Sequence, residues 1–419
     1  MKLPSTSPLY VEMIVGAKRI PVGRLAMDRG GAVFEYDAAF ISAGLSLNPL
    51  WETPSREPIP ARNPRTFEGL HGVFADSLPD AWGRELMRRR CARAGLDFDS
   101  LTGLEHLALV GERAMGAMAY RPAVSDQGDD IVDLDLLAFE AHEILEGRDS
   151  DVLLELERLG GSSGGARPKV LVALNDRGEA RSGVGDIPDG YDAWLVKFAN
   201  SRDVPDIGPL EAAYAAIARA AGLRVPDHRL IAAKRGPGYF ASKRFDRGAG
   251  AVRKHVISAA GVLEIDWSVP AIDYDNLLRL VRAVTRDQQE VEEMFRRMVF
   301  NVVAHNRDDH AKQHAFIYDH LTKRWALAPA YDLSNSSGPG GEHYLAVAGE
   351  GRNVSARAVK VVASAHDIKP RRVRAIVAEV LGGVELFEKF AADYDLSVAT
   401  RTATSRAISA AANKLGELA

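Results

Sequence analysis

The sequence is short of several features that mark particular classes of protein. Its 419 residues include a single cysteine, Cys91, so no disulfide can form within the chain, which favours a reducing compartment over secretion. The N-terminus, MKLPSTSPLYVEMIVG, lacks a basic segment followed by a long apolar run, and nowhere do 18 apolar residues follow one another. These absences predict a cytoplasmic protein that makes no contact with a membrane.

Basic residues are not in excess either. Lys and Arg number 53 against 57 Asp and Glu, which gives a net charge of −4. No overall positive field therefore attracts nucleic acid, although a local basic patch is compatible with this composition. We expect the chain alone to bind DNA weakly and without sequence preference.

The chain is long enough for two or three domains, and its patterns divide it into three segments. Residues 1–150 begin with a β-meander at 9–36, marked by strand patterns between glycine turns, and continue as helix and loop. Residues 151–257 are rich in strand patterns such as KVLVAL and YDAWLVKFA, whereas residues 258–419 are mainly helical.

The segment EVEEMFRRMVFNVVAHN, residues 290–306, carries a strong helical pattern. Its apolar residues recur with the spacing of one helix face, at Val291, Met294, Phe295, Met298, Val299, Val302 and Val303. A charged cluster follows directly and contains Asp308 and Asp309 among His305, His310, Lys312 and His314. Three interpretations of this cluster compete: a metal site, a solvated turn and a catalytic loop.

A metal site would use His310 and His314. They are four residues apart, and on a helix both imidazoles would share one face, as zinc hydrolases require. The helix, however, is predicted to end near Asn306, the following HAFIYD is typical of a strand, and no glutamate lies between the two histidines. The spacing therefore fits a zinc site poorly, and a solvated turn is the plain alternative.

The third interpretation is phosphoryl transfer. Protein kinases carry the loop H-R-D-x-x-x-x-N, in which the Asp orients the attacking hydroxyl and the Asn, five residues later, holds magnesium. In this sequence Asp308 is followed five residues later by Gln313. Asp332 comes after two predicted strands, where a second magnesium ligand is needed, and Lys197 lies in a strand after the glycine-rich segment GGSSGG, where it could bind phosphates.

Five motifs occur in the order GGSSGGARPK, WLVKFA, SKRFDR, NRDDHAKQHAF and APAYDLS. In this order the sequence resembles the HipA family of bacterial serine/threonine kinases, the toxins of toxin–antitoxin pairs. The stretch GLHGVFADSLPDAWGRELM resembles the N-terminal region of that family, so the resemblance spans most of residues 10–335. It implies an α+β, two-lobed protein-kinase-like fold: a small β-rich N-terminal domain (1–150), a β-rich nucleotide-binding lobe (151–257) and a helical C-terminal lobe (258–419), with the active site between the lobes.

The resemblance also implies roles for single residues, with ATP and Mg²⁺ as cofactors. Asp308 would be the catalytic aspartate, His310 and Lys312 would approach the nucleotide or the transferred phosphate, and Gln313 and Asp332 would hold Mg²⁺. The residues implied to bind ATP are Lys197 at the phosphates, Ser163, Gly164 and Gly165 in the glycine-rich segment, Lys243, Phe245 and Asp246 at the adenine and ribose, and Tyr331. Ser162 would be the residue that such kinases autophosphorylate to switch themselves off.

The sequence departs from the family pattern in two places. Gln313 stands where the family usually has Asn, and its extra methylene moves the amide oxygen by about a bond length, which matters for the near-octahedral geometry of magnesium. Ser163 lies beside Ser162, so either serine or both can be the modified residue.

As partners, the resemblance implies a HipB-like helix-turn-helix antitoxin, which would carry the contacts with DNA, and a protein substrate. Residues 1–150 are the expected docking surface for the antitoxin, and glutamyl-tRNA synthetase is the substrate suggested by family precedent. An alternative is a catalytically weak kinase-like protein that acts with the antitoxin in operator repression, and Gln313 is the feature that keeps this alternative open.

Overall fold

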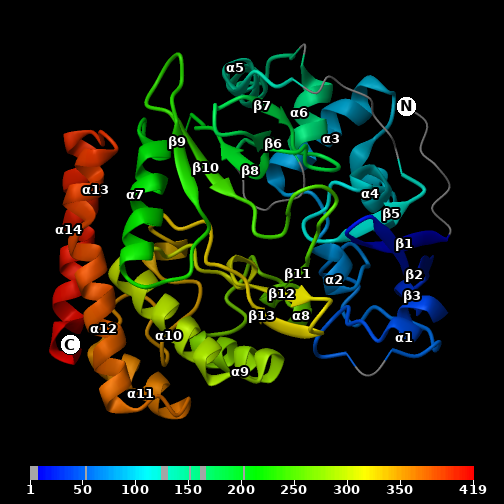
Figure 1. Cartoon of the computed structure of the whole chain (residues 1–419). Coiled ribbons are helices and arrows are strands. Elements are labelled where there is room, and N and C mark those ends of the chain that lie inside the picture. The colour runs from blue at the N-terminus through cyan, green and yellow to red at the C-terminus, as the bar shows by residue number, and fades with distance from the viewer. Residues whose placement is uncertain (1–7, 52–53, 124–130, 151, 161–166, 202) are drawn as a thin grey trace. The chain divides into compact units, whose positions relative to one another are not determined.

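The structure is a computed structural model that describes residues 8–51, 54–123, 131–150, 152–160, 167–201 and 203–419 (Figure 1). The chain forms two compact units. Unit 1 comprises Met1–Asp203, Ala241–Asp266 and Ile317–Arg324, and unit 2 comprises Val204–Phe240, Trp267–Phe316 and Trp325–Ala419. The mixture of sheets and helices confirms the predicted α+β class, whereas the predicted domain boundaries at residues 150 and 257 stay a prediction.

Unit 1 begins with the predicted β-meander. Strands β1 (Leu9–Val15), β2 (Lys18–Asp28) and β3 (Gly31–Tyr36) pair antiparallel in succession. Strands β4 (Ile59–Pro60) and β5 (Met118–Arg121) complete a sheet of order β4-β3-β2-β1-β5. Side chains in β1 alternate, with Leu9, Val11 and Met13 in the core and Tyr10 exposed, as expected for a sheet with one buried face.

Unit 1 also contains helices. They are α1 (Ala38–Ala43), α2 (Gly72–Ala75), α3 (Ala81–Arg93), η1 (Phe98–Ser100), α4 (Gly103–Val110), α5 (Leu134–Leu145), α6 (Leu153–Gly160) and α8 (Ala259–Leu263). Helix α3 starts at its N-cap Asp80, whose side chain accepts from the Gly83 backbone N–H at 2.7 Å. An Asp at this position satisfies one of the free N–H groups of the first turn.

Two further sheets follow along the chain. The first has the order β7-β6-β8-β10-β9, with β6 (Lys169–Leu174), β7 (Ala180–Ser182), β8 (Asp192–Lys197), β9 (His228–Ile231) and β10 (Tyr239–Lys243). Every residue of β6 is buried, which explains the apolar run VLVAL that follows its first residue, Lys169. The second has the order β11-β12-β13, with β11 (His255–Ser258), β12 (Ala315–Asp319) and β13 (Arg324–Leu327).

Unit 2 is mainly helical. Its helices are α7 (Ile207–Ala220), α9 (Tyr274–Thr285), α10 (Gln288–Val303), η2 (Ala311–Gln313), η3 (Pro339–Gly341), α11 (Ala356–Ala365), α12 (Pro370–Glu385), α13 (Phe387–Asp393), α14 (Val398–Leu415) and η4 (Gly416–Leu418). Helices α12 and α13 pack on α7, and α10 packs on α9, α12 and α14 (Figure 1). All the apolar residues that the sequence pattern assigned to one face of α10 are buried, so that prediction is confirmed.

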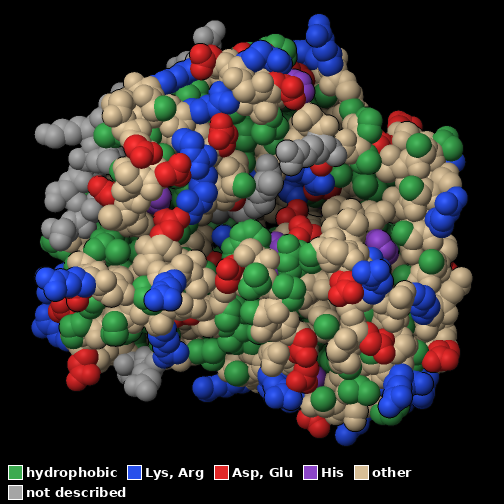
Figure 2. All heavy atoms as spheres, turned by 180° about the vertical axis from the view of Figure 1, so that it is seen from behind, with side chains coloured by type: hydrophobic (Ala, Val, Ile, Leu, Met, Phe, Trp, Pro, Cys, Tyr) green, Lys and Arg blue, Asp and Glu red, His purple; other side chains and the backbone are tan. Residues whose placement is uncertain are grey.

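The surface carries charges of both signs. Lys and Arg side chains are interspersed with Asp and Glu side chains across the face shown in Figure 2. Such mixing is what the small net charge of the sequence predicts.

Within the described ranges, no helix has both the length and the apolar character needed to cross a bilayer.

Candidate active site

The charged loop starts where helix α10 ends. Ala304 is the C-cap of the helix, and His305 then adopts the left-handed backbone conformation with φ +55°. Asn306 turns back onto the helix, where its backbone N–H donates to the Asn301 carbonyl at 2.9 Å. The prediction that the helix ends near Asn306 is therefore confirmed.

His310 and His314 do not share a helical face. They cap the two ends of the short 3₁₀ helix η2, and His314 leads directly into β12. Among the residues that the structure describes, no group of three or more His, Cys, Asp and Glu side chains is placed to hold a metal ion. The spacing of the two histidines therefore lacks the geometry of a zinc hydrolase in this structure.

The two adjacent carboxylates of the loop have opposite environments. The side chain of Asp308 is 49% exposed, whereas that of Asp309 is fully buried. The Nε2 atom of His310 lies 3.8 Å from Oδ1 of Asp308. Asp308 is therefore the carboxylate that solvent and a substrate can reach.

Asp309 anchors the loop from within unit 2. Its Oδ2 accepts a hydrogen bond from Tyr274 Oη at 2.7 Å and lies 2.9 Å from Nδ1 of His343, while its Oδ1 accepts from the Tyr344 backbone N–H at 2.9 Å. These partners come from the start of α9 and from the loop after β13. No local sequence pattern identifies them, because they are separated from Asp309 by more than 30 residues.

His310 and Lys312 pack against Trp267, a residue that the sequence analysis missed. The ring centroids of His310 and Trp267 are 4.7 Å apart, and Lys312 Nζ lies 5.9 Å from the Trp267 ring centroid. Tyr344 contacts His310 edge-on, with the ring centroids 5.3 Å apart. His310, which lies next to Asp308, and Lys312 therefore share Trp267 as a neighbour.

The two predicted magnesium ligands are in contact. Gln313 Nε2 donates to Asp332 Oδ2 at 2.7 Å, and the preceding residue, Tyr331, donates from its hydroxyl to the Lys312 carbonyl at 2.7 Å. A half-turn of the Gln313 amide would place its oxygen, instead of its nitrogen, beside the carboxylate. Magnesium prefers oxygen ligands, binds through one or two carboxylates and keeps several waters, so these residues fit such an ion.

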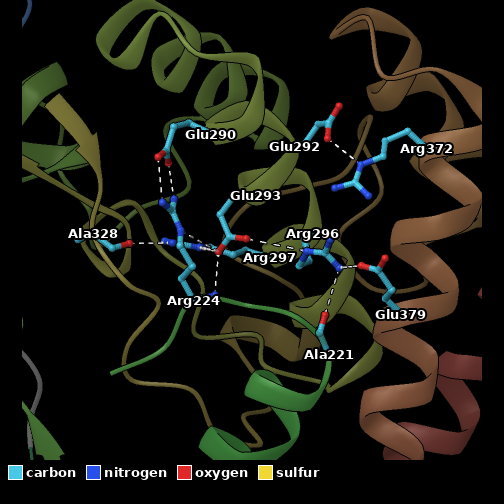
Figure 3. Close-up of polar contacts among 10 residues, drawn as sticks. All are labelled: Ala221, Arg224, Glu290, Glu292, Glu293, Arg296, Arg297, Ala328, Arg372 and Glu379. Atoms are coloured by element: carbon cyan, nitrogen blue, oxygen red, sulfur yellow. Dashed lines mark hydrogen bonds and ion pairs between the residues drawn. The ribbon is translucent and has the colours of Figure 1, made fainter. Parts of the chain in front are cut away.

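A buried network of charges supports the segment that leads to Asp332 (Figure 3). Arg297, on α10, donates from Nη2 to the Ala328 carbonyl at 2.7 Å and from Nε to Glu293 at 3.1 Å. Glu293 also accepts from the Arg224 backbone N–H at 3.2 Å. Burial lowers the pKa of Arg297, and the Glu293 carboxylate opposes this effect. The apolar spacing of α10 gave no sign that Glu293 and Arg297 are buried.

The predicted ATP-binding residues Lys197, Lys243, Phe245 and Asp246 belong to unit 1, whereas the residues from Asp308 to Asp332 discussed above belong to unit 2. Lys197 is the last residue of β8 and is only partly buried. Its neighbour on β6, Lys169, is buried and donates to Asp80 Oδ2 at 2.5 Å. Lys243, at the end of β10, forms an ion pair with Asp192 at 2.7 Å.

Asp246 is a buried member of an ion-pair network. Its Oδ1 accepts from Arg244 Nε at 2.9 Å, and its Oδ2 accepts from the Gly116 backbone N–H at 2.7 Å and from Arg247 Nη1 at 2.9 Å. Burial alone would raise the pKa of Asp246, but the two guanidinium groups outweigh it and hold the pKa well below its usual range. Both carboxylate oxygens of Asp246 therefore already accept hydrogen bonds within unit 1. The expected contact between Asp246 and a ribose stays a prediction.

The glycine-rich segment lies outside the described residues. It contains the predicted ATP-binding residues Ser163, Gly164 and Gly165 and the predicted autophosphorylation site Ser162. Their assigned roles therefore stay predictions.

The two buried histidines of the loop make stability depend on pH. Burial lowers the pKa of His310 and of His314 to about 4, so both are neutral in the folded protein near neutrality. In the unfolded chain they take up protons below about pH 6.5, so the free energy of unfolding is greatest above that pH and falls as the pH drops towards 4. Between pH 7 and 5.5 each histidine should remove about 1 kcal/mol.

Denaturant unfolding at several pH values measures this dependence. His314→Gln should reduce the loss of stability between pH 7 and 5.5, whereas His142→Gln, at an exposed histidine of α5, should leave it unchanged. Equal pH dependence in the parent and both variants would show that His314 does not titrate as its burial requires.

Comparison with known proteins shows what the chain resembles. The model of the HipA-like C-terminal domain matches residues 161–386, and the model of the HipA N-terminal domain matches residues 13–121. Among solved structures, HipA of Shewanella oneidensis MR-1, in a complex with HipB and its operator DNA, is 14% identical with a TM-score of 0.69, and 97% of each chain is covered. This similarity shows that the two chains share a fold.

The Helicobacter pylori proinflammatory kinase CtkA is a more distant structure. It is 13% identical with a TM-score of 0.33, and the match covers 54% of this chain and 92% of that one. This score is too low to show a common fold. A search of curated proteins gave no match.

Proposed function

The chain belongs to the HipA family, and from this premise we propose that it is an ATP- and Mg²⁺-dependent protein serine/threonine kinase, the toxin of a toxin–antitoxin pair. One observation carries the proposal. Within a single loop, the exposed Asp308 follows a fixed helix end, and Gln313, five residues later, touches Asp332. This is the order and spacing of an acid that orients a hydroxyl and of two ligands for magnesium.

The residues of unit 2 have separable roles in such a reaction. Asp308 accepts the proton of the attacking serine or threonine hydroxyl and orients its oxygen. Lys312, whose Nζ lies 5.9 Å from the centre of the Trp267 ring, would supply positive charge to the nucleotide or the transferred phosphate. Gln313 and Asp332 would hold magnesium, which when bound neutralises charge on the phosphates of ATP. Most of the rate enhancement would then come from positioning the reactants and neutralising the charge of the phosphates, because the protein takes little covalent part in phosphoryl transfer.

Residues of unit 1 would bind the nucleotide. Lys197 is placed at a strand end with its side chain partly accessible, as a lysine that contacts phosphates requires. The backbone around Lys243 and Phe245 would hold the adenine, and Ser163, Gly164 and Gly165 would cover the phosphates. Tyr331, which belongs to unit 2 and precedes the proposed magnesium ligand Asp332, would also bind ATP.

Gln313→Asn should preserve or raise the rate of phosphoryl transfer. Asn restores the shorter amide of the family pattern at a position that already faces Asp332. The initial rate at saturating ATP and Mg²⁺ measures the effect. A fall of more than about tenfold, equivalent to about 1.4 kcal/mol, would show that the loop is built around the longer side chain.

We propose that the chain autophosphorylates at Ser162 and thereby becomes less active. A phosphate on Ser162 adds nearly two negative charges to a segment proposed to bind the phosphates of ATP. The phosphoserine and the ATP phosphates would then repel each other. Phosphopeptide mapping after incubation with Mg²⁺ and ATP tests this. Phosphate at Ser162 is expected, and phosphate at Ser163 alone, or at neither serine, would contradict the assignment.

The proposed partners are a HipB-like helix-turn-helix antitoxin and a protein substrate. The solved complex of Shewanella HipA with HipB and operator DNA supports such an antitoxin, which would carry the DNA contacts, with residues 1–150 of this chain as the docking surface. Glutamyl-tRNA synthetase is our candidate substrate. Cytoplasmic localisation is part of the same proposal.

A further inference from the structure

A small cavity lies beneath the candidate catalytic loop, inside unit 2. It measures about 10 Å³, enough for one water molecule and no larger group. It is lined by Arg297, Asn301, Asn306, Asp309, Gln313, His314, Ala330, Tyr331 and Leu333. Two of these residues, Asn306 and His314, each carry a buried polar atom, Oδ1 and Nε2 respectively, that has no hydrogen-bond partner in the described part of the chain.

The orientation of Asn306 is fixed by a chain of hydrogen bonds that starts at Asp309. A carboxylate can only accept, so Tyr274 must donate its hydroxyl hydrogen to Asp309, at 2.7 Å. The Tyr274 oxygen then accepts from Asn301 Nδ2 at 2.9 Å, which leaves Asn301 Oδ1 to accept from Asn306 Nδ2, also at 2.9 Å. Asn306 Oδ1 is therefore an acceptor that still needs a donor.

His314, which lines the same cavity, carries a second acceptor. Its ring hydrogen-bonds the backbone of Asp309, and because Nε2 has no partner among the described residues, the bonding atom is Nδ1. The Arg297 guanidinium lines the same cavity and disfavours a second buried cation there, so the ring is neutral and carries a single N–H. With that hydrogen on Nδ1, Nε2 has a lone pair and needs a donor.

We infer that one ordered water occupies this cavity and donates one hydrogen to Asn306 Oδ1 and the other to His314 Nε2. Water suits the site because it supplies two donors in a volume that admits nothing larger. Arg297 also lines the cavity, and its guanidinium disfavours a buried cation there while offering donors to the water oxygen. The buried acceptors would otherwise destabilise the loop.

The water joins the two ends of the loop that carries Asp308 and Gln313. Asn306 lies near the start of this loop and His314 at its end. A water bridge between them would restrain the residues in between, which include Asp308 and Gln313. Asn306 and His314 are then positioning residues. This second step rests on the proposed function, whereas the presence of the water does not.

A crystal structure of the full chain at about 1.8 Å resolution tests the water site directly. One ordered water is expected within about 2.7–3.2 Å of both Asn306 Oδ1 and His314 Nε2. A cavity without density, a metal ion, or a direct bond between the two side chains would each overturn the inference. Nitrogen-15 NMR of the imidazole in the full chain gives a second test, because a hydrogen on Nε2 of His314 at pH 7 would also overturn it.

Kinetics of two variants test the positioning role. His314→Phe removes the acceptor and should lower kcat for phosphoryl transfer by about tenfold or more with little change in the KM for ATP, since misplacing a catalytic group mainly slows chemistry. His314→Gln offers an amide oxygen instead and should recover most of the loss. Parental kcat in the Phe variant, or equal losses in both, would overturn the role. A chain that shows no phosphoryl transfer at all would refute the proposed function, and the crystal and NMR results would still decide the water site.

Discussion

Asp308→Ala is expected to lower the rate of phosphoryl transfer by about 10²- to 10⁴-fold while the protein stays folded. The variant removes the group that orients the attacking hydroxyl and accepts its proton. Because the Asp308 side chain is half exposed, its loss should change the free energy of unfolding by less than about 1 kcal/mol. Initial rates of phosphate transfer to protein, with unfolding curves of the same preparation, measure both effects.

The adjacent Asp309 provides a matched control for this prediction. Asp309→Ala removes a carboxylate of the same type one residue away, but one that is buried and bonded to Tyr274, His343 and the backbone of Tyr344. It should destabilise the fold by on the order of 3 kcal/mol. If Asp308→Ala kept the parental rate, or lost stability as Asp309→Ala does, the assignment of the catalytic acid would be wrong.

Asp332→Asn should lower the rate by at least about 100-fold at a fixed Mg²⁺ concentration, because it removes the charge that would hold the metal. Asparagine is a better replacement than alanine here, since Asp332 has a positive φ of +56° and Asn tolerates that conformation. A titration with Mg²⁺ should show a higher half-maximal concentration for the variant.

A matched control for Asp332 is Asp319→Asn, at an exposed residue at the end of β12. It should leave both the rate and the Mg²⁺ dependence unchanged. An Asp332→Asn protein with the parental Mg²⁺ requirement would show that this carboxylate holds no metal.

Much of unit 2 could be predicted because its sequence signals are local. The spacing of Val291, Met294 and Phe295 along α10 follows from the helical period, and the end of the helix near Asn306 sets the start of the loop. Gln313 and Asp332, which the family resemblance implied as two ligands of one magnesium ion, lie in contact. These predictions depend on neighbours in the sequence, where periodicity and turn patterns are informative.

The sequence could not tell which of the two adjacent carboxylates is exposed. Asp308 and Asp309 have the same chemistry, and their environments differ only because Tyr274 and His343, each more than 30 residues away, fold onto Asp309. A similar reason applies to lysines in strands. Lys197 was assigned to phosphate binding because it lies in a strand after the glycine-rich segment. In the described part of the chain, however, the strand lysine that is buried is Lys169, whose partner Asp80 lies 89 residues earlier.

The buried charges of Glu293 and Arg297 have the same origin. In the sequence they are ordinary polar positions of α10, and their partners Ala328 and Arg224 come from distant parts of the chain. Tertiary contacts of this kind are set by the whole chain, so a local pattern carries no information about them.

The most direct measurement of the proposed activity is transfer of the labelled γ-phosphate of ATP to protein by the purified full chain. We expect label on the chain itself in the presence of Mg²⁺, none after the metal is removed by a chelator, and almost none for Asp308→Ala under the same conditions. Absence of label with Mg²⁺, or equal labelling of the parent and Asp308→Ala, would contradict the proposal that this loop catalyses phosphoryl transfer.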